Sequence, residues 1–203
     1  MENKDSFVEL ELVAGMSGYG KTQYVVDKLD RQKPILVLDF RGQVAEKFQV
    51  RPMQSRLEII EELQHNPVPF IIYQPGFEDY EIEQDIEFFL VIALCMKDSQ
   101  IFIDEIDFEL KPTEYPKEFR KVIASARTQH LSIFVTAHRL KECPLKLRAL
   151  GKKIIFHLEE ESDLEYLKGL QGFNEEKIKS LPYYQYIVLP VAQEKPPTLP
   201  IDK

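Results

Sequence analysis

The chain has 203 residues, of which 44% are hydrophobic and 30% charged, ordinary values for a folded soluble protein of one α/β domain. No apolar run approaches the ~18 residues that span a bilayer, the polar N-terminus lacks a signal-peptide core, and two cysteines without C-x-x-C spacing argue against a disulfide framework or a thiolate metal site. The net charge of −8, taken alone, argues against binding to nucleic acid.

The first predicted elements are a strand over residues 7–13, which alternate and are rich in strand formers, and a helix over residues 22–29. The segment between them matches the pattern G-x-x-x-x-G-K-[ST] at every fixed position and reads Gly15-Met16-Ser17-Gly18-Tyr19-Gly20-Lys21-Thr22. Glycines let successive backbone N–H groups turn inward around an anion, and the helix N-terminus then faces the phosphates. We expect this loop to bind ATP, with Lys21 reaching the β- and γ-phosphates and the Thr22 hydroxyl coordinating Mg²⁺.

The rest of the chain alternates apolar runs with helical patterns, which predicts a mostly parallel central sheet flanked by helices on both faces. The further expected strands are residues 34–40, 69–73, 101–105, 131–137, 153–158 and 184–189. The further expected helices are residues 55–64, with Leu57, Ile60 and Leu63 facing inward, residues 82–96, residues 116–126, a short helix ending near Gly151, residues 162–170 and residues 175–181. We expect one P-loop NTPase domain over residues 1–190 and an extended proline-rich tail over residues 191–203.

The apolar run over residues 101–105 ends in two adjacent acids, Asp104 and Glu105. Hydrolysis of a nucleotide needs a carboxylate that holds the metal and a group that orients water. We expect Asp104 to hold Mg²⁺ through a water, and Glu105 to accept a proton from the attacking water or to position it. The alternative is that both acids only cap the next helix. Asp107 and Glu109 are expected on a solvated face with no catalytic role.

Charge is segregated along the chain. Residues 111–153 contain eleven basic residues and three acidic ones, so this segment carries +8 and the remainder −16. Such segregation indicates that one face meets a polyanion, such as duplex DNA, or an acidic neighbouring subunit. The alternative is solvated helix faces with charge-complementary packing inside the monomer. For a DNA contact, the first candidates are Lys146, Arg148, Lys152 and Lys153, and the second is the helix over residues 116–127.

The chain resembles the FtsK–HerA superfamily of ring-forming, DNA-pumping ATPases, especially its small viral genome-packaging members. The resemblance rests on Leu36-Val37-Leu38-Asp39-Phe40 followed by Arg41-Gly42-Gln43, and on the block that runs from Arg127 to Arg139. It implies an additional-strand, RecA-like sheet and a homo-oligomeric ring, a pentamer or hexamer, that acts on double-stranded viral DNA. It also implies a capsid or portal vertex protein as partner, and a location in the host cytoplasm or on the virion.

The same resemblance assigns roles within the second block. Arg127 resembles the finger that reaches the γ-phosphate in a neighbouring subunit, with Arg139 as second candidate and Arg120 as third. The polar sensor after the buried strand, usually glutamine, is His138 here, whose imidazole can still hydrogen-bond phosphate or water. Two other functions stay open: a small-molecule kinase, which needs a mobile arginine-rich lid, and a nucleotide-regulated assembly protein, which has no need for Glu105.

Overall fold

The computed structural model describes residues 10–76, 79–109 and 115–190. Within these ranges, seven strands form a single sheet of order β3-β2-β4-β5-β1-β6-β7. The strands are β1 (Leu10–Ala14), β2 (Ile35–Asp39), β3 (Phe70–Tyr73), β4 (Gln100–Asp104), β5 (Ser132–Ala137), β6 (Lys152–Ile155) and β7 (Ile187–Leu189). All neighbouring pairs are parallel except β6 and β7, which are antiparallel. One strand, β5, lies between β1 and β4, as in the additional-strand arrangement.

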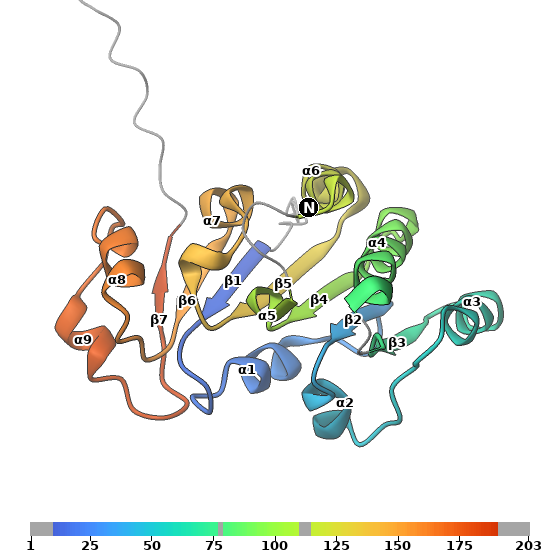
Figure 1. Cartoon of the computed structure of the whole chain (residues 1–203), viewed down its shortest axis with the longest axis horizontal. Helices are drawn as coiled ribbons and strands as arrows, with labels where there is room; N and C mark the ends of the chain where they lie inside the picture. The colour runs from blue at the N-terminus through green and yellow to red at the C-terminus, as the bar shows by residue number, and fades with distance from the viewer. Residues whose placement is uncertain (1–9, 77–78, 110–114, 191–203) are drawn as a thin grey trace, which may run out of the picture.

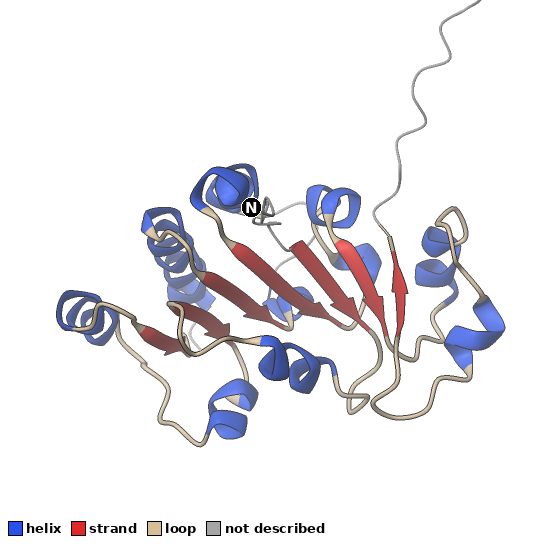
Figure 2. Cartoon of the chain, turned by 180° about the vertical axis from the view of Figure 1, so that it is seen from behind, coloured by secondary structure: helices blue, strands red, loops and turns tan. Residues whose placement is uncertain are grey.

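Helices cover both faces of this sheet (Figure 1). They are α1 (Lys21–Lys28), α2 (Gln43–Phe48), α3 (Arg56–His65), α4 (Asp79–Cys95), α5 (Ile106–Glu109), α6 (Lys117–Gln129), α7 (Leu145–Leu150), α8 (Glu161–Leu167) and α9 (Glu175–Lys179), with a 3₁₀ turn at Leu140–Glu142. Helices α4, α6 and α7 lie above the sheet in Figure 1, and α1 and α2 lie below it; the view from behind in Figure 2 shows the same two layers. The predicted α/β fold, a mostly parallel sheet with helices on both faces, is therefore confirmed.

The hydrophobic core is divided by the sheet into two clusters, and β2 shows why. Leu36 and Leu38 belong to the larger cluster on the side of α4 and α6, while Ile35 and Val37 belong to the smaller cluster on the side of α1 and α2. All four side chains are buried. A strand buried on both faces needs a continuous apolar run, because successive side chains point to opposite sides of the sheet.

Of the three α3 residues expected to face inward, Leu63 packs against the core, but Leu57 and Ile60 do not. Leu57 is 63% exposed and Ile60 is 39% exposed, whereas Ile59 is buried. The physical reason is that α3 packs at the β3 edge of the sheet through the row that contains Ile59 and Leu63. Arg56, on the same row, forms an ion pair with Asp85 of α4, with Nε 2.9 Å from Oδ1, and this pair also holds that side of the helix inward.

The last strand is shorter than expected, because it begins at Ile187 instead of residue 184. Residues before it form a turn in which Tyr184 has φ 63°, and Tyr184 N donates a hydrogen bond to Tyr19 O of the glycine loop (3.0 Å). The turn therefore lies against the glycine loop. The predicted tail over residues 191–203 and the start of the first predicted strand, residues 7–9, lie outside the described residues. No helix in the described part of the chain is long and apolar enough to cross a membrane.

Candidate nucleotide site

The glycine loop joins β1 to α1 and is held at its start by two neighbouring strands. Gly15 N donates to Ala137 O at the end of β5 (3.3 Å), and Met16 N donates to His157 O after β6 (2.9 Å). Within residues 10–76, 79–109 and 115–190, no group accepts a hydrogen bond from the backbone N–H groups of residues 17–22. These donors surround the N-terminus of α1, so they are available to a bound anion.

Two glycines of the loop stand where no other residue fits. Gly15 has φ 153°, and a Cβ there would lie 2.7 Å from the Phe156 Cβ. Gly20, the N-cap of α1, has φ 104°, and its Cβ would lie 2.6 Å from the Tyr184 Cδ1. The loop thus requires glycine both for its left-handed backbone and for its close packing against neighbouring segments.

Lys21 is the buried cation of the loop. Its Nζ donates to Gly15 O (2.8 Å) and to Met16 O (3.1 Å), and 5% of the residue is exposed. Burial lowers the pKa of Lys21, and the nearby carboxylates, first of all Glu105 and Asp104, oppose this effect. The ammonium group therefore lies beneath the loop, next to the free N–H groups that face the anion site.

Asp104 at the end of β4 meets Thr22 of the glycine loop. Thr22 Oγ1 donates to Asp104 Oδ1 (3.1 Å), and Thr136 Oγ1 of β5 donates to the same oxygen (2.6 Å). Burial, together with the charges of Asp39 and Glu105, raises the pKa of Asp104 to about 6, although the hydrogen bonds from these hydroxyls oppose the rise. Asp39 lies opposite Asp104 in the register of β2 and β4.

This arrangement fits Mg²⁺. A carboxylate and a hydroxyl are the hard oxygen ligands that Mg²⁺ prefers, and Asp104 Oδ1 accepts hydrogen bonds from two hydroxyls but forms no ion pair with any described residue. The described ranges contain no group of three or more His, Cys, Asp or Glu side chains that could hold a metal ion. A cation between Thr22 and Asp104 would therefore complete its coordination with phosphate oxygens and waters.

Glu105 follows β4 in a left-handed conformation, φ 49°, and three residues hold it. Its N donates to Thr136 Oγ1 (2.7 Å), its Oε1 lies 2.9 Å from His138 Nε2, and its Oε2 lies 2.8 Å from Arg41 Nε. Burial raises the pKa of Glu105, but the contacts with His138, Arg41 and Lys21 outweigh it, so the pKa lies below its ordinary value. The structure thus brings together Lys21, Thr22, Asp104, Glu105 and His138 from the predicted set.

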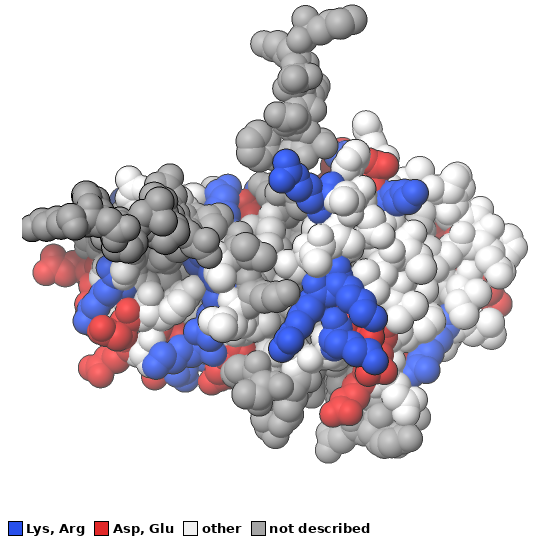
Figure 3. Space-filling model, turned by 90° about the horizontal axis from the view of Figure 1, so that it is seen from above, with Lys and Arg blue, Asp and Glu red and all other residues white. Residues whose placement is uncertain are grey.

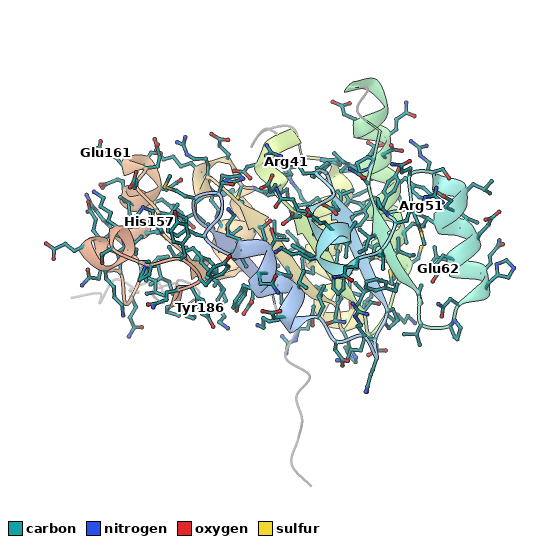
Figure 4. All side chains as sticks on the ribbon, turned by 90° about the horizontal axis from the view of Figure 1, so that it is seen from below. Arg41, Arg51, Glu62, His157, Glu161 and Tyr186 are labelled. Carbon is teal, nitrogen blue, oxygen red and sulfur yellow. The ribbon has the colours of Figure 1, made fainter. Side chains whose placement is uncertain are left out.

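Sequence reasoning missed Arg41 as a site residue. It named Arg41 only as part of a family-like turn after β2, yet β2 is the direct neighbour of β4 in the sheet. Because the carboxyl ends of parallel neighbours meet at one edge, a polar residue just after β2 was the available signal for a contact with Glu105. In the view of Figure 4, Arg41 lies on one side of α1, and His157 and Tyr186 lie on the other.

Asp107 does not lie on a solvated face, contrary to expectation. Its Oδ2 accepts hydrogen bonds from His138 N (2.8 Å) and Arg139 N (2.8 Å). Helix α5 begins directly after Glu105, so Asp107 lies close to the residues that follow β5. Asp107 therefore fixes the turn that carries His138 toward Glu105. The side chain of Glu109 lies outside the described residues.

The two arginines proposed as fingers differ in their surroundings. Arg139 is engaged within the chain, with Nη2 3.0 Å from Glu160 Oε1 and Nε 3.4 Å from Asp163 Oδ2 at the start of α8. Arg127 is exposed near the C-terminal end of α6, and no described residue forms an ion pair with it. Helix α6 leads into the amino end of β5, so Arg127 lies at the opposite edge of the sheet from Lys21.

Three of the four first candidates for a DNA contact, Arg148, Lys152 and Lys153, are engaged within the chain. Lys153 is fully buried and its Nζ donates to Gly151 O (2.8 Å), with burial lowering its pKa. Lys152 Nζ lies 2.8 Å from Glu11 Oε1, and the Arg148 guanidinium lies over the Tyr166 ring, 5.1 Å from its centroid. The side chain of Lys146 is not described. Lys152 therefore pairs with Glu11 of β1, and Arg148 packs on Tyr166 of α8.

The second candidate, helix α6, does carry an exposed basic face. Its exposed cations are Lys117, Arg120, Lys121 and Arg127. Seen from above in Figure 3, Lys and Arg side chains gather on the face of the molecule that α6 covers. One carboxylate partner is near, since Lys121 Nζ lies 3.5 Å from Glu118 Oε1. The exposed part of the basic segment is thus concentrated on α6.

Comparison with known proteins shows similarity at the level of the fold. No protein-family model and no curated protein sequence matches the chain. Among solved structures, the chain is similar to the genome packaging NTPase B204 from Sulfolobus turreted icosahedral virus 2 in complex with AMP, with 15% identity and TM-score 0.68 over 90% of this chain and 92% of that chain. It is also similar to B204, the DNA-packaging ATPase from Sulfolobus turreted icosahedral virus, with 15% identity and TM-score 0.64 over 94% of each chain. The resemblance to small viral genome-packaging ATPases is thus confirmed for the fold.

Proposed function

We propose that the protein is a Mg²⁺-dependent ATPase that forms a ring, translocates double-stranded DNA and packages a viral genome into a preformed capsid. The observation that carries the hydrolytic part is the position of Glu105. Its carboxylate is held by Arg41 and His138 and lines the same pocket as Gly18, Lys21 and Thr22. A carboxylate beside a phosphate-binding loop is the arrangement that activation of water for hydrolysis needs.

Each residue of the site has a task in this proposal. The free N–H groups of residues 17–22 and the ammonium of Lys21 bind the phosphates, and Glu105 accepts a proton from water or orients it. Thr22 and Asp104 hold Mg²⁺, which when bound neutralises charge on the phosphate oxygens. His138, 2.9 Å from Glu105, couples the orientation of that carboxylate to the end of β5.

The packaging part of the proposal rests on two further observations. The fold is similar to that of two viral B204 proteins over at least 90% of this chain. In addition, the exposed cations of α6 offer a surface for the phosphate backbone of DNA although the whole chain carries −8. Arg127 lies at the edge of the sheet opposite the loop of its own chain, which supports a role in a neighbouring subunit of a homo-oligomeric ring. A capsid or portal protein is the partner that packaging requires.

The test is phosphate release from ATP with Mg²⁺ and no acceptor, measured with and without double-stranded DNA. We expect hydrolysis without an acceptor and a rate that rises with DNA of any sequence, because backbone contacts carry no sequence information. ATP binding without phosphate release under any of these conditions would instead indicate a nucleotide-regulated assembly protein. Phosphate transfer only to an added small molecule would indicate a kinase.

A further inference from the structure

A second pocket adjoins the phosphate-binding pocket, and the two share Gly20, Gln23 and Tyr184. The first pocket, of about 180 Å³, is lined mainly by the glycine loop and the start of α1. The second, of about 310 Å³, runs along the outer side of α1 to Phe156 and Tyr186. The phosphate-binding pocket and the second pocket are therefore neighbours along the start of α1, with Tyr184 lining both.

The walls of the second pocket are aromatic. Tyr24 and Tyr186 have ring centroids 4.9 Å apart, and Phe156 and Tyr186 have centroids 5.5 Å apart. Tyr184 completes the lining. Tyr184 and Tyr186 are 69% and 43% exposed, so both tyrosines keep surface accessible to a ligand beside the phosphate site. A flat aromatic ligand would remove this surface from water and gain stacking energy.

The backbone at the junction is held in an unusual conformation. Tyr184 has φ 63°, a region that is costly for a residue with a large side chain. It is maintained by the hydrogen bond from Tyr184 N to Tyr19 O and by the contact with Gly20, where any Cβ would clash with the Tyr184 ring. This packing positions the ring of Tyr184 between the two pockets.

The rim of the second pocket supplies polar groups on α1. Gln23 and Asp27 lie one helical turn apart, and Gln23 Nε2 donates to Asp27 Oδ1 (2.6 Å). A carboxylate and an amide can together accept from and donate to ribose hydroxyls or the edge of a base. Lys28, also at the rim, is engaged by Glu11, with Nζ 3.0 Å from Oε1.

We propose that this second pocket binds the nucleoside of the nucleoside triphosphate, a proposal that rests on the proposed function. The purine ring stacks on Tyr186, Tyr184 flanks the ribose at the junction, and Gln23 and Asp27 face the polar edges. A volume of about 310 Å³ lies within the ~300–1,000 Å³ range of ligand pockets, which leaves room for a base and its ribose.

The test compares ATP with inorganic tripolyphosphate, which has the same phosphates but no nucleoside. Binding of both ligands is measured by calorimetry with Mg²⁺ for the wild type, Tyr186→Ala, Tyr186→Phe and a control, Leu57→Ala, which truncates an exposed side chain on α3. We expect Tyr186→Ala to weaken ATP binding about tenfold and to leave tripolyphosphate binding unchanged. Tyr186→Phe, which keeps the ring, and Leu57→Ala should bind both ligands as the wild type does.

A spectroscopic measurement adds an independent readout, because the chain contains no tryptophan. The variant Tyr186→Trp places a single indole in the pocket, and ATP, but not tripolyphosphate, should change its fluorescence. Equal weakening of both ligands by Tyr186→Ala, or an unchanged affinity for ATP, would overturn the nucleoside site while leaving the ATPase proposal standing. Failure of the wild type to bind either ligand would instead overturn the proposed function itself.

Discussion

Arg41 and Glu105, which are 64 positions apart in the chain, meet at the carboxyl edge of the sheet, with Arg41 Nε 2.8 Å from Glu105 Oε2. The other carboxylate oxygen, Oε1, lies 2.9 Å from His138 Nε2. Each oxygen of the proposed water-orienting group is therefore held by a nitrogen from a residue that follows a different neighbouring strand, β2 or β5. This arrangement fixes the direction of the carboxylate, whose backbone is already restricted to φ 49°.

The first prediction concerns Arg41 as a positioning residue. We expect Arg41→Ala to lower kcat for ATP hydrolysis about 10- to 100-fold, because a carboxylate displaced by ~1 Å loses productive geometry. The affinity for ATP should change little, and Arg41→Lys should recover part of the rate. Steady-state kinetics together with ATP titration separates the two effects. A rate above that of the wild type would show that Arg41 restrains Glu105 and does not support it.

The second prediction separates binding from turnover within the site. Glu105→Gln keeps shape but loses the carboxylate, so we expect normal ATP affinity and a loss of turnover of about 100-fold or more. Lys21→Ala removes the buried ammonium beneath the loop and should weaken ATP binding itself. Equilibrium binding and single-turnover hydrolysis are measured for both variants. Wild-type turnover in Glu105→Gln would remove Glu105 from the proposed role.

The third prediction tests a finger that acts between subunits. Arg127→Ala subunits retain an intact loop, and Lys21→Ala subunits retain an intact Arg127. Each variant alone should be nearly inactive, and mixing the two should restore part of the hydrolysis, because Arg127 of one subunit can then serve the loop of another. Activity is followed across mixing ratios. Absence of rescue at every mixing ratio argues against the finger.

Arg139→Ala serves as comparison and should lower thermal stability instead, since Arg139 pairs with Glu160 and Asp163.

The fourth prediction places the DNA contact on α6. Charge reversal of Lys117, Arg120 and Lys121 to Glu should weaken binding to duplex DNA and abolish its effect on hydrolysis, with basal ATPase activity retained. Wild-type binding should weaken as salt rises, because each neutralised phosphate releases counterions. The matched control reverses three exposed lysines elsewhere, Lys168, Lys177 and Lys179. Equal losses in both triple variants would mean that overall charge, and not α6, is responsible.

The fifth prediction concerns the buried carboxylate of Glu11 on β1. It is held by Lys152 and Lys28, with both Nζ atoms within 3.0 Å of Oε1, and by Tyr24, whose hydroxyl donates to Oε2 (2.9 Å). Burial raises the pKa of Glu11, but the hydrogen bonds from Lys152 and Lys28 outweigh it, so the pKa is lowered from 4.5. The stabilisation is therefore present above the unfolded pKa and is lost as pH falls through the folded pKa.

Glu11→Gln tests this pairing. At pH 7 we expect the variant to unfold with a free energy about 1–3 kcal/mol below that of the wild type, and the difference should shrink at acid pH, where the wild type loses the same charge. Urea unfolding at several pH values gives the comparison. A difference that stays constant from neutral to acid pH would show that packing, and not ionisation of Glu11, accounts for the loss.

The amino-acid sequence by itself determined the features that depend on local backbone demands and on the period of apolar residues. The loop from Gly15 to Thr22 was recognisable because a concave run of N–H groups requires glycine at fixed spacing. The central strands were recognisable because a strand buried on both faces needs an unbroken apolar run. Asp104 and Glu105 stood out because two acids directly follow such a run.

Only the tertiary structure decided which side chains meet across elements, because strand order and helix placement are set by packing of the whole core. Arg41 reaches Glu105 because β2 lies next to β4 in the sheet. No local sequence pattern indicates which strands are neighbours. Lys153 looks like a surface cation in the sequence, yet it is fully buried. The aromatic pocket beside α1 likewise exists only because the turn before β7 folds back onto Gly20, which brings together residues more than 160 positions apart.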